Sequence, residues 1–309
     1  MRPWKLAFWM LSAALFAQSG RIEGPSLGIV WHEDSRSLRP VWGVFGAAWL
    51  GDPLPADADL EFVAVAPGSR WALARVARGG RSFSARLTWP AGRVHIEELE
   101  GFAGAVEPAV FSPSGIFAAA GGLRVGQPEA EAAAVLEPFA HELPEGSQIL
   151  ALSDAGVALL AVPDGGQWAL CRAGAGRQFE RLATLAAIDA AAFLPDSSAA
   201  FAASGRELYR LAPDGVLEPW MSIEPARRLA ATADRLLAAH DAGVTMIDHR
   251  ARAIAAFSAC ECRPSVLAPA VSSLFWLTGA DAQPAWLLNA ATAGVRFVPM
   301  PPAAEEDGQ

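Results

Sequence analysis

The sequence predicts an all-β protein in which similar small sheets form a closed ring, and three observations support this. A hydrophobic run, a turn rich in Pro, Asp or Ser and a second hydrophobic run return six times. The copies are spaced by about 40 residues, the length of one β-propeller blade. Helix-length amphipathic segments are scarce, although 52% of the residues are hydrophobic. The six copies, called hairpin repeats below, are 62–73, 109–118, 150–159, 192–201, 229–238 and 267–276.

Each hairpin repeat begins a unit in which four strands can be traced. In the fourth unit we expect strands at 191–194, 199–202, 207–211 and 216–220, separated by Pro-Asp, Ser-Gly and Pro-Asp-Gly turns. Proline ends a strand because it donates no ladder hydrogen bond, and Gly, Asp or Ser beside it adopts turn conformations. In the second unit, 129–136 is Ala-rich, and we expect a loop followed by a strand there.

The N-terminal strands predict how the ring closes. Segments 27–32 and 38–44 precede the first hairpin repeat and resemble the last two strands of a blade. A ring removes its exposed edges by pairing its two ends. We therefore expect seven blades, the last one a composite of N-terminal and C-terminal strands. Six blades with an added hairpin is the alternative.

Two turns support a resemblance to known proteins. Val110-Phe-Ser-Pro-Ser-Gly115 and Ala192-Phe-Leu-Pro-Asp196 resemble the Phe-Ser-Pro-Asp-Gly hairpins of bacterial WD-repeat-like and YVTN-like β-propellers. The resemblance covers nearly the whole chain after its N-terminal segment and implies the fold, but such rings carry many functions. Gly-His and Trp-Asp pairs at the ends of the repeats are absent, so the interaction surface of true WD repeats is not implied.

The chain divides into three predicted segments. Residues 1–19 have the form of a secretory signal, because Arg2 and Lys5 precede a short apolar run and Ala17-Gln-Ser19 offers small residues for cleavage after Ser19. An uncleaved anchor or a buried first strand is the alternative. Residues 20–299 form one propeller domain, and the proline-rich acidic segment 300–309 is predicted to be disordered. We expect a periplasmic or extracellular protein with no membrane span after cleavage.

Charge and composition exclude several functions. Residues 1–19 hold the only lysine, so the rest of the chain has 22 arginines against 33 acidic residues, a formal charge of about −11. This balance disfavours nucleic acid and anionic membranes as partners. Without lysine, a Schiff base, a pyridoxal site or a Gly-Lys-Ser/Thr phosphate loop cannot form. The five histidines show no metal-ligand spacing, and no Gly-x-Ser-x-Gly motif occurs.

Candidate binding residues lie in the connections between blades, which share one face of a propeller with the loops between second and third strands. Two carboxylates there could act as acid and base, and several oxygens could hold calcium, but charged loops are common in any globular protein. We predict no resident cofactor or metal. The candidate binding residues are Trp49, Asp52, Glu107, His141, Glu142, Glu224, Arg227 and Arg263.

Cysteines and tryptophans provide two further signals. Cys260 and Cys262 form a Cys-Glu-Cys segment between two units, for which we favour a structural disulfide or thiol pair over a redox or copper site. Cys171 is expected to be a buried apolar residue. Most tryptophans are expected to wedge between neighbouring sheets. A carbohydrate-stacking surface would require several of them on one face, and Trp49 is the best loop candidate.

These observations favour an exported, monomeric, non-catalytic binding or scaffolding module for a protein or an extended polymer. The alternative is a propeller hydrolase or lyase that uses loop carboxylates, with calcium as a conceivable cofactor. The two functions predict different structures. An enzyme needs two carboxylates close together at the mouth of the central channel, whereas a binding module needs a broad apolar or aromatic surface.

Overall fold

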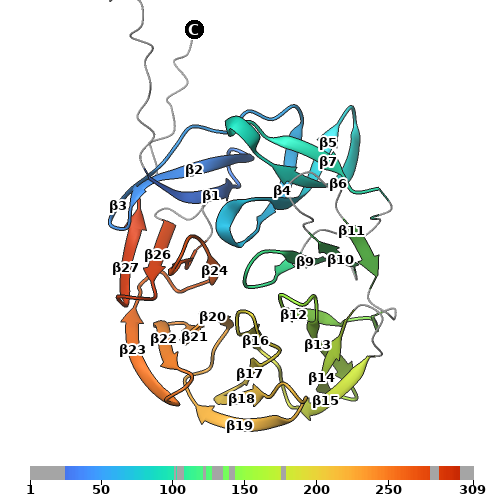
Figure 1. The fold of residues 1–309 in the computed structure, drawn as a ribbon, viewed down its shortest axis with the longest axis vertical. Helices are drawn as coiled ribbons and strands as arrows, with labels where there is room; N and C mark the ends of the chain where they lie inside the picture. Colours follow the sequence, from blue (N-terminus) through green and yellow to red (C-terminus); the bar gives the residue numbers. More distant parts are fainter. Residues whose placement is uncertain are drawn as a thin grey trace, which may run out of the picture.

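The computed structural model describes residues 25–100, 102, 108–120, 123–126, 135–138, 143–174, 179–278 and 285–299. Their strands form seven antiparallel sheets arranged around a central axis (Figure 1), and these residues contain no α-helix. The predicted seven-bladed β-propeller is confirmed. Within the same residues, no helix is long and apolar enough to cross a membrane. The signal segment and the C-terminal tail lie outside the described residues.

The sheets are called blades 1 to 7 in chain order, and the first strand of blades 2 to 7 is the innermost one (Figure 1). Blade 1 contains β1 (Ser26–His32), β2 (Ser37–Val44) and β3 (Ala47–Leu50). Blade 2 contains β4 (Asp59–Val65), β5 (Ala72–Arg78), β6 (Arg81–Thr88) and β7 (His95–Glu98). Blade 3 contains β8 (Val110–Phe111), β9 (Phe117–Ala120), β10 (Leu123–Gly126) and β11 (Val135–Pro138).

The other four blades repeat this order. Blade 4 contains β12 (Gln148–Leu152), β13 (Ala158–Asp164), β14 (Gln167–Ala173) and β15 (Glu180–Leu185). Blade 5 contains β16 (Ala190–Phe193), β17 (Ala200–Ser204), β18 (Glu207–Leu211) and β19 (Leu217–Ser222). Blade 6 contains β20 (Arg228–Ala231), β21 (Arg235–His240), β22 (Gly243–Asp248) and β23 (Ala253–Ala259). Blade 7 contains β24 (Ala268–Pro269), β25 (Leu274–Trp276), β26 (Ala285–Asn289) and β27 (Gly294–Val298).

The hairpin repeats join the first and second strands of blades 2 to 7, as predicted. In blade 4 the N–H of Gly156 donates to the Ser153 carbonyl, and the buried Ser153 hydroxyl accepts the Val157 N–H at 3.0 Å. Ser112 accepts the Phe117 N–H in the same way in blade 3, at 3.2 Å. A buried serine thus satisfies a backbone donor that the tight turn leaves without a ladder partner.

Blade 1 differs from the others because its described part has three strands. The start of β1 lies at the hairpin tips of blades 2 and 7, since a Cβ on Gly28 would meet Ser69 Oγ at 2.6 Å and Val271 Cγ2 at 3.6 Å. In a complete blade, the second strand begins at the hairpin face, because the first hairpin joins it to the first strand. Strands β1 to β3 therefore occupy the positions of the second, third and fourth strands.

The expectation that N-terminal strands complete the last sheet is wrong. Blade 7 draws all four of its strands from the C-terminal part of the chain, and in the described residues β1 to β3 pair only with one another. The ring closes there by packing: Leu27, Val41 and Leu50 form one apolar cluster with Leu274 and residues around it in blade 7. A hydrogen bond of 3.2 Å from the Gly68 N–H to the Ala270 carbonyl links the hairpin tips of blades 2 and 7.

The hydrophobic core is distributed over the spaces between neighbouring blades. Each of the seven interfaces, including that between blades 1 and 7, contains its own cluster of buried side chains. Trp71 is fully buried between blades 2 and 3, and Trp220 is buried between blades 5 and 6. The prediction that tryptophans wedge between sheets is confirmed at these positions.

Antiparallel pairing gives the ring two different faces. The first hairpins of the blades lie on one face, called the hairpin face. The turns between second and third strands lie on the opposite face, together with the connections between blades, and this is called the connection face. For example, the Ile223 N–H in a connection donates to the carbonyl of Arg206 in such a turn. The two faces carry different cavities.

Candidate functional site

A cleft with three tryptophans opens between blades 1 and 2. Its volume is about 860 Å³, and Asp52 is the one ionisable residue among those that line it. Trp42 and Trp89 are half-buried, whereas Trp49 is 50% exposed. The lining includes Trp42, Trp49, Trp89, Pro40, Pro53 and Pro55. This set, called the tryptophan cleft, is apolar, aromatic and nearly free of charge.

Strand register places two of these indoles side by side. Trp42 pairs with Ser26 on β1 and with Trp49 on β3, and directly paired residues of an antiparallel sheet point to the same side. Trp49 was predicted in a loop, but it lies in β3, because the chain forms a tight turn at Phe45-Gly46 and pairs once more with β2. The register thus forms an aromatic platform that the sequence pattern did not reveal.

Gly51 lies against the ring of Trp42 and leaves room for it, because glycine has no side chain. A Cβ on Gly51 would meet Nε1 of Trp42 at 2.5 Å and Cγ of Pro40 at 2.9 Å. The backbone here is held by hydrogen bonds from Gly51 N–H to the Pro40 carbonyl and from Leu54 N–H to the Leu38 carbonyl, at 2.7 and 2.8 Å. The chain leaving β3 therefore forms one wall of the cleft at a fixed distance from the indole.

Blade 2 supplies the opposite wall. Trp89 precedes the short 3₁₀ turn η2 (Pro90–Gly92), and the Val94 N–H donates to the Pro55 carbonyl at 2.9 Å. This bond ties the turn to the segment that connects the two blades. A salt bridge between Arg93 and Asp57, at 2.5 Å, joins the same two segments on the outside. The backbone beside Trp89 is consequently tied to the connection between the blades, and Trp89 lines the cleft together with Trp42 and Trp49.

A second cavity lies on the connection face between blades 6 and 7, and it is rich in arginine. Its volume is about 720 Å³. Asp241 is the one acidic residue among those that line it, and it forms an ion pair with Arg227 at 2.9 Å. The lining includes Arg227, Arg228, Arg263, Asp241, Pro264 and Ser265. We call this cavity the arginine pocket.

The central channel lies between the two faces and is apolar. Its cavity of about 330 Å³ is lined mainly by the innermost strands of blades 3 to 7. Arg228 is the one charged residue in this lining, and Arg228 and Ser265 also line the arginine pocket. The arginine pocket therefore lies at the connection-face mouth of the channel. The described residues place no pair of carboxylates in this channel.

The predicted site residues thus divide between two places. Trp49 and Asp52 line the tryptophan cleft, and Arg227 and Arg263 line the arginine pocket. Glu224 lies outside both linings and pairs with Arg206 at 3.1 Å across the connection face. The predictions for Glu107, His141 and Glu142 lie outside the described residues.

Sequence reasoning missed three important site residues, Trp42, Trp89 and Arg228. Trp42 and Trp89 were expected to wedge between sheets. They instead line the cleft that opens at blade 1, and this position became visible only in the structure. Arg228 directly follows Arg227 and begins β20, so the Arg-Arg pair was the available signal. Neither the tryptophans nor the Arg-Arg pair indicates, from sequence, on which face of the ring the side chains lie.

Cys260 and Cys262 form the predicted disulfide, with Cα atoms 5.1 Å apart. Cys171 is free and buried, and burial raises the pKa of its thiol. In the described residues, no group of three or more His, Cys, Asp or Glu side chains is arranged to hold a metal ion.

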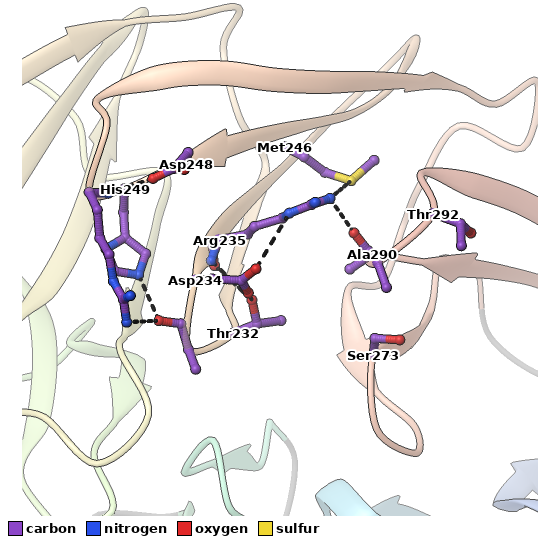
Figure 2. Close-up of polar contacts among 12 residues, drawn as sticks. Thr232, Asp234, Arg235, Met246, Asp248, His249, Ser273, Ala290 and Thr292 are labelled. Carbon is purple, nitrogen blue, oxygen red and sulfur yellow. Dashed lines mark hydrogen bonds and ion pairs between the residues drawn. The ribbon is translucent and has the colours of Figure 1, made fainter.

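Polar contacts at the hairpin tip of blade 6 have a structural explanation. Figure 2 shows Arg235 reaching from this hairpin to the Ala290 carbonyl of blade 7, at 2.5 Å, and passing the Met246 sulfur at 3.9 Å. Asp248 accepts N–H bonds from Arg250 and Ala251, which lower the pKa of its carboxyl group. These contacts tie the two blades together and cap a turn, so we assign them no ligand.

His240 lies in the scaffold beneath the arginine pocket. Its Nε2 lies 3.0 Å from the Thr245 hydroxyl, and its ring stacks on Phe257. Burial lowers the pKa of this imidazole, and the nearby carboxylates of Glu224 and Asp241 oppose the shift. The histidine is 8% exposed, whereas Asp241, next in the chain, lines the pocket.

Comparisons with known proteins support the fold. No protein-family model matches the chain, and no curated protein matches it either. A solved structure of a protein from Lactobacillus plantarum is similar with a TM-score of 0.54 and 13% identity, over 89% of this chain and 95% of that one. A putative 6-phosphogluconolactonase from Bacteroides fragilis has a TM-score of 0.52 and 12% identity, over 88% and 92%.

A prolyl endopeptidase is also similar, with a TM-score of 0.53 and 15% identity over 88% of this chain, but the match covers 48% of that chain. At these identities the likeness shows a β-propeller fold and nothing more specific. The proteins of this fold found here include hydrolases and lactonase-like proteins. Function must therefore be argued from the cavities.

Proposed function

We propose that the protein is a non-catalytic binding module and that the tryptophan cleft holds an extended, uncharged polysaccharide. The observation that carries this proposal is the set of three indoles in one open cleft, with Trp49 half exposed and aligned with Trp42. An indole offers a large rigid apolar face together with one N–H donor, which suits the apolar face and hydroxyl rim of a sugar ring. A contiguous exposed apolar surface, here built from three indoles and several prolines, marks a binding site more often than a single exposed hydrophobic residue does.

The polar groups of the cleft agree with this ligand class. Ser26, Asp52 and Ser69 add hydroxyl and carboxylate oxygens beside the indoles. A few convergent polar groups in an aromatic cleft orient a ligand through hydrogen bonds. Because Asp52 is the one ionisable side chain in the lining, binding of an uncharged polymer removes water from only one charged group of the cleft. A strongly anionic polymer would face this carboxylate and the acidic charge of the chain.

The enzyme alternative receives less support from the described residues. Hydrolysis of a glycosidic bond requires two carboxyl groups about 5 to 9.5 Å apart. The tryptophan cleft contains one carboxylate, and the one in the arginine pocket is paired with Arg227. We also propose that the protein is exported and monomeric. The disulfide supports an oxidising compartment, because such bonds are rare in the cytosol.

The test is binding of soluble oligosaccharides of four to six units, drawn from β-glucan, xylan, chitin and α-glucan series, measured by titration calorimetry. We expect at least one series to bind and Trp49→Ala to weaken that binding at least ten-fold. Gly51→Ala should do the same, because its methyl group would displace the Trp42 ring. Phe297→Ala is the matched control, since Phe297 is 56% exposed on the outer strand β27.

Three outcomes would overturn the proposal. Binding of a proline-rich peptide but of no oligosaccharide would assign the cleft to a protein ligand. Cleavage of a bound oligosaccharide, detected by mass spectrometry, would make the protein an enzyme. Equal loss of affinity in the Phe297 and Trp49 variants would place the site outside the cleft.

A further inference from the structure

The arginine pocket contains more positive charge than its ion pair neutralises. Three guanidinium groups line it, and Asp241 neutralises that of Arg227. Among the described residues, neither Arg228 nor Arg263 forms an ion pair, whereas many other arginines of the chain do. The whole chain has a formal charge of −9. A local excess of cations in an acidic protein is not explained by solubility.

The backbone around the pocket is held in place, because each segment that supplies an arginine forms backbone hydrogen bonds with a neighbouring blade. The Arg227 N–H donates to the Ala239 carbonyl at 2.8 Å, and the Ser265 N–H donates to the Leu277 carbonyl at 3.0 Å. Between them, the Cys260 N–H bonds to the Ala242 carbonyl at 3.1 Å. The first bond joins the connection before blade 6 to β21, the third joins the connection after it to the turn between β21 and β22, and the second joins that same connection to blade 7. The guanidinium groups therefore start from fixed backbone positions.

The disulfide sets the direction of Arg263. Cys260 and Cys262 are bridged, and Arg263 follows at once with a positive φ of 47°. A non-glycine residue adopts this conformation when its surroundings impose it. Here the bridge on one side and the buried Pro264 on the other confine the backbone. The Cys-Glu-Cys segment therefore presents Arg263 to the pocket.

We propose that the arginine pocket binds a small molecule with two or more oxyanion groups, either carboxylates or phosphates. The fork of a guanidinium group forms two parallel hydrogen bonds with such a group, and these charge-assisted bonds are stronger than neutral ones. Arg263 provides one fork, and Arg228 provides its remaining N–H donors, since its Nη1 donates to the Arg227 carbonyl at 2.9 Å. The Ser265 hydroxyl adds a further donor, and a volume of about 720 Å³ accommodates a multiply charged metabolite. The site lies on the face opposite the hairpin tips and is independent of the tryptophan cleft.

The experiment is titration calorimetry in 150 mM NaCl with citrate as the carboxylate probe and pyrophosphate as the phosphate probe. We expect one of the two to bind more tightly, and this result identifies the chemical class. Arg263→Ala and Arg228→Ala should each weaken that binding at least ten-fold. Arg263→Lys should retain part of the affinity, because it keeps the charge but loses the fork.

Arg210→Ala is the matched control, since Arg210 is an exposed arginine on β18 of blade 5. All the substituted arginines are exposed, so unchanged unfolding temperatures will show that the variants are folded. The proposal fails if neither probe binds at millimolar concentration, or if both bind equally and the Arg210 variant loses as much affinity as the Arg263 variant. The latter result would show that the anionic probes bind exposed arginines in general and not the arginine pocket.

Discussion

The tryptophan cleft opens on the hairpin face, since Ser69 and Val271 at two hairpin tips line it, whereas the arginine pocket lies on the connection face. The two cavities also differ in the way they are built. The cleft occurs at blade 1, where the repeating pattern lacks its innermost strand in the described chain and the connection 51–58 follows the sheet edge. The arginine pocket occurs between two complete blades, where the connection contains the Cys260–Cys262 disulfide and Arg263 with its positive φ. In both places the cavity marks a departure from the repeat.

This difference teaches that regular blades provide the scaffold and irregular segments provide the chemistry. The regular interfaces bury mainly Ala, Leu and Val, and such residues fill space without selecting a ligand. The junction between blades 1 and 7, called the seam, depends on side-chain packing and a few hydrogen bonds. The arginine pocket instead depends on backbone hydrogen bonds that hold its connections to blades 6 and 7. The two cavities should therefore respond differently to the same kind of change.

The largest effect is expected at the seam beside the cleft. Gly28 has a φ of 117° and lies against Ser69, so Gly28→Ala should lower the free energy of unfolding by about 2 to 4 kcal/mol. Gly205→Ala is the control, because Gly205 also has a positive φ but no atom within 4 Å of the place that an added methyl group would occupy. It should cost about 1 kcal/mol. Urea denaturation measures both, and equal losses would show that the seam is not tightly packed.

A smaller effect is expected from the disulfide. Cys260 and Cys262 close a very short loop, so replacing both with Ser should lower the free energy of unfolding by only about 1.5 kcal/mol. Affinity for the anion probe should fall several-fold, because Arg263 is no longer confined. Oligosaccharide binding should stay unchanged. A loss of oligosaccharide binding would contradict the independence of the two cavities.

The salt dependence of affinity should distinguish the arginine pocket from the tryptophan cleft. Raising NaCl from 50 to 500 mM should weaken the anion probe several-fold, because the guanidinium groups are exposed and their charges are screened. Oligosaccharide affinity should change less than two-fold, since the cleft has one ionisable side chain. Calorimetric titrations of both ligands at the two salt concentrations test this. Parallel losses would assign the same electrostatic mechanism to both sites.

The smallest effect concerns pH and the scaffold of the arginine pocket. The pKa of His240 is lowered in the folded protein, so the folded state binds its proton less readily than the unfolded chain, whose value is about 6.5. The stability contributed by the neutral imidazole of His240 is therefore fully present above about pH 6.5 and is lost as the pH falls below it. His240→Gln should therefore flatten the decline of the unfolding temperature between pH 7 and 5. Identical pH profiles would show that His240 does not contribute.

Much of the fold could be predicted from the order of residues. The turn residues around Ser112, Ser153 and Pro195 define the hairpins locally, because their hydrogen bonds and backbone angles involve neighbours in the chain. The closure of the ring was predicted incorrectly. Local pattern shows that β1 and β2 are strands, but it does not show whether they pair with a distant strand or only pack against one.

The sequence by itself determined the class of fold and the absence of lysine chemistry after residue 19, and it favoured seven blades over six, since each follows from local spacing or composition. It also paired Cys260 with Cys262, but it left a disulfide and a thiol pair open, and the structure shows the disulfide. Only the tertiary structure decided that Trp42, Trp49 and Trp89 share a cleft, and that Arg227, Arg228 and Arg263 share a pocket on the opposite face. The physical reason is that a closed ring brings together residues from different blades. Their proximity depends on strand register and blade packing, and neither is encoded in a single repeat.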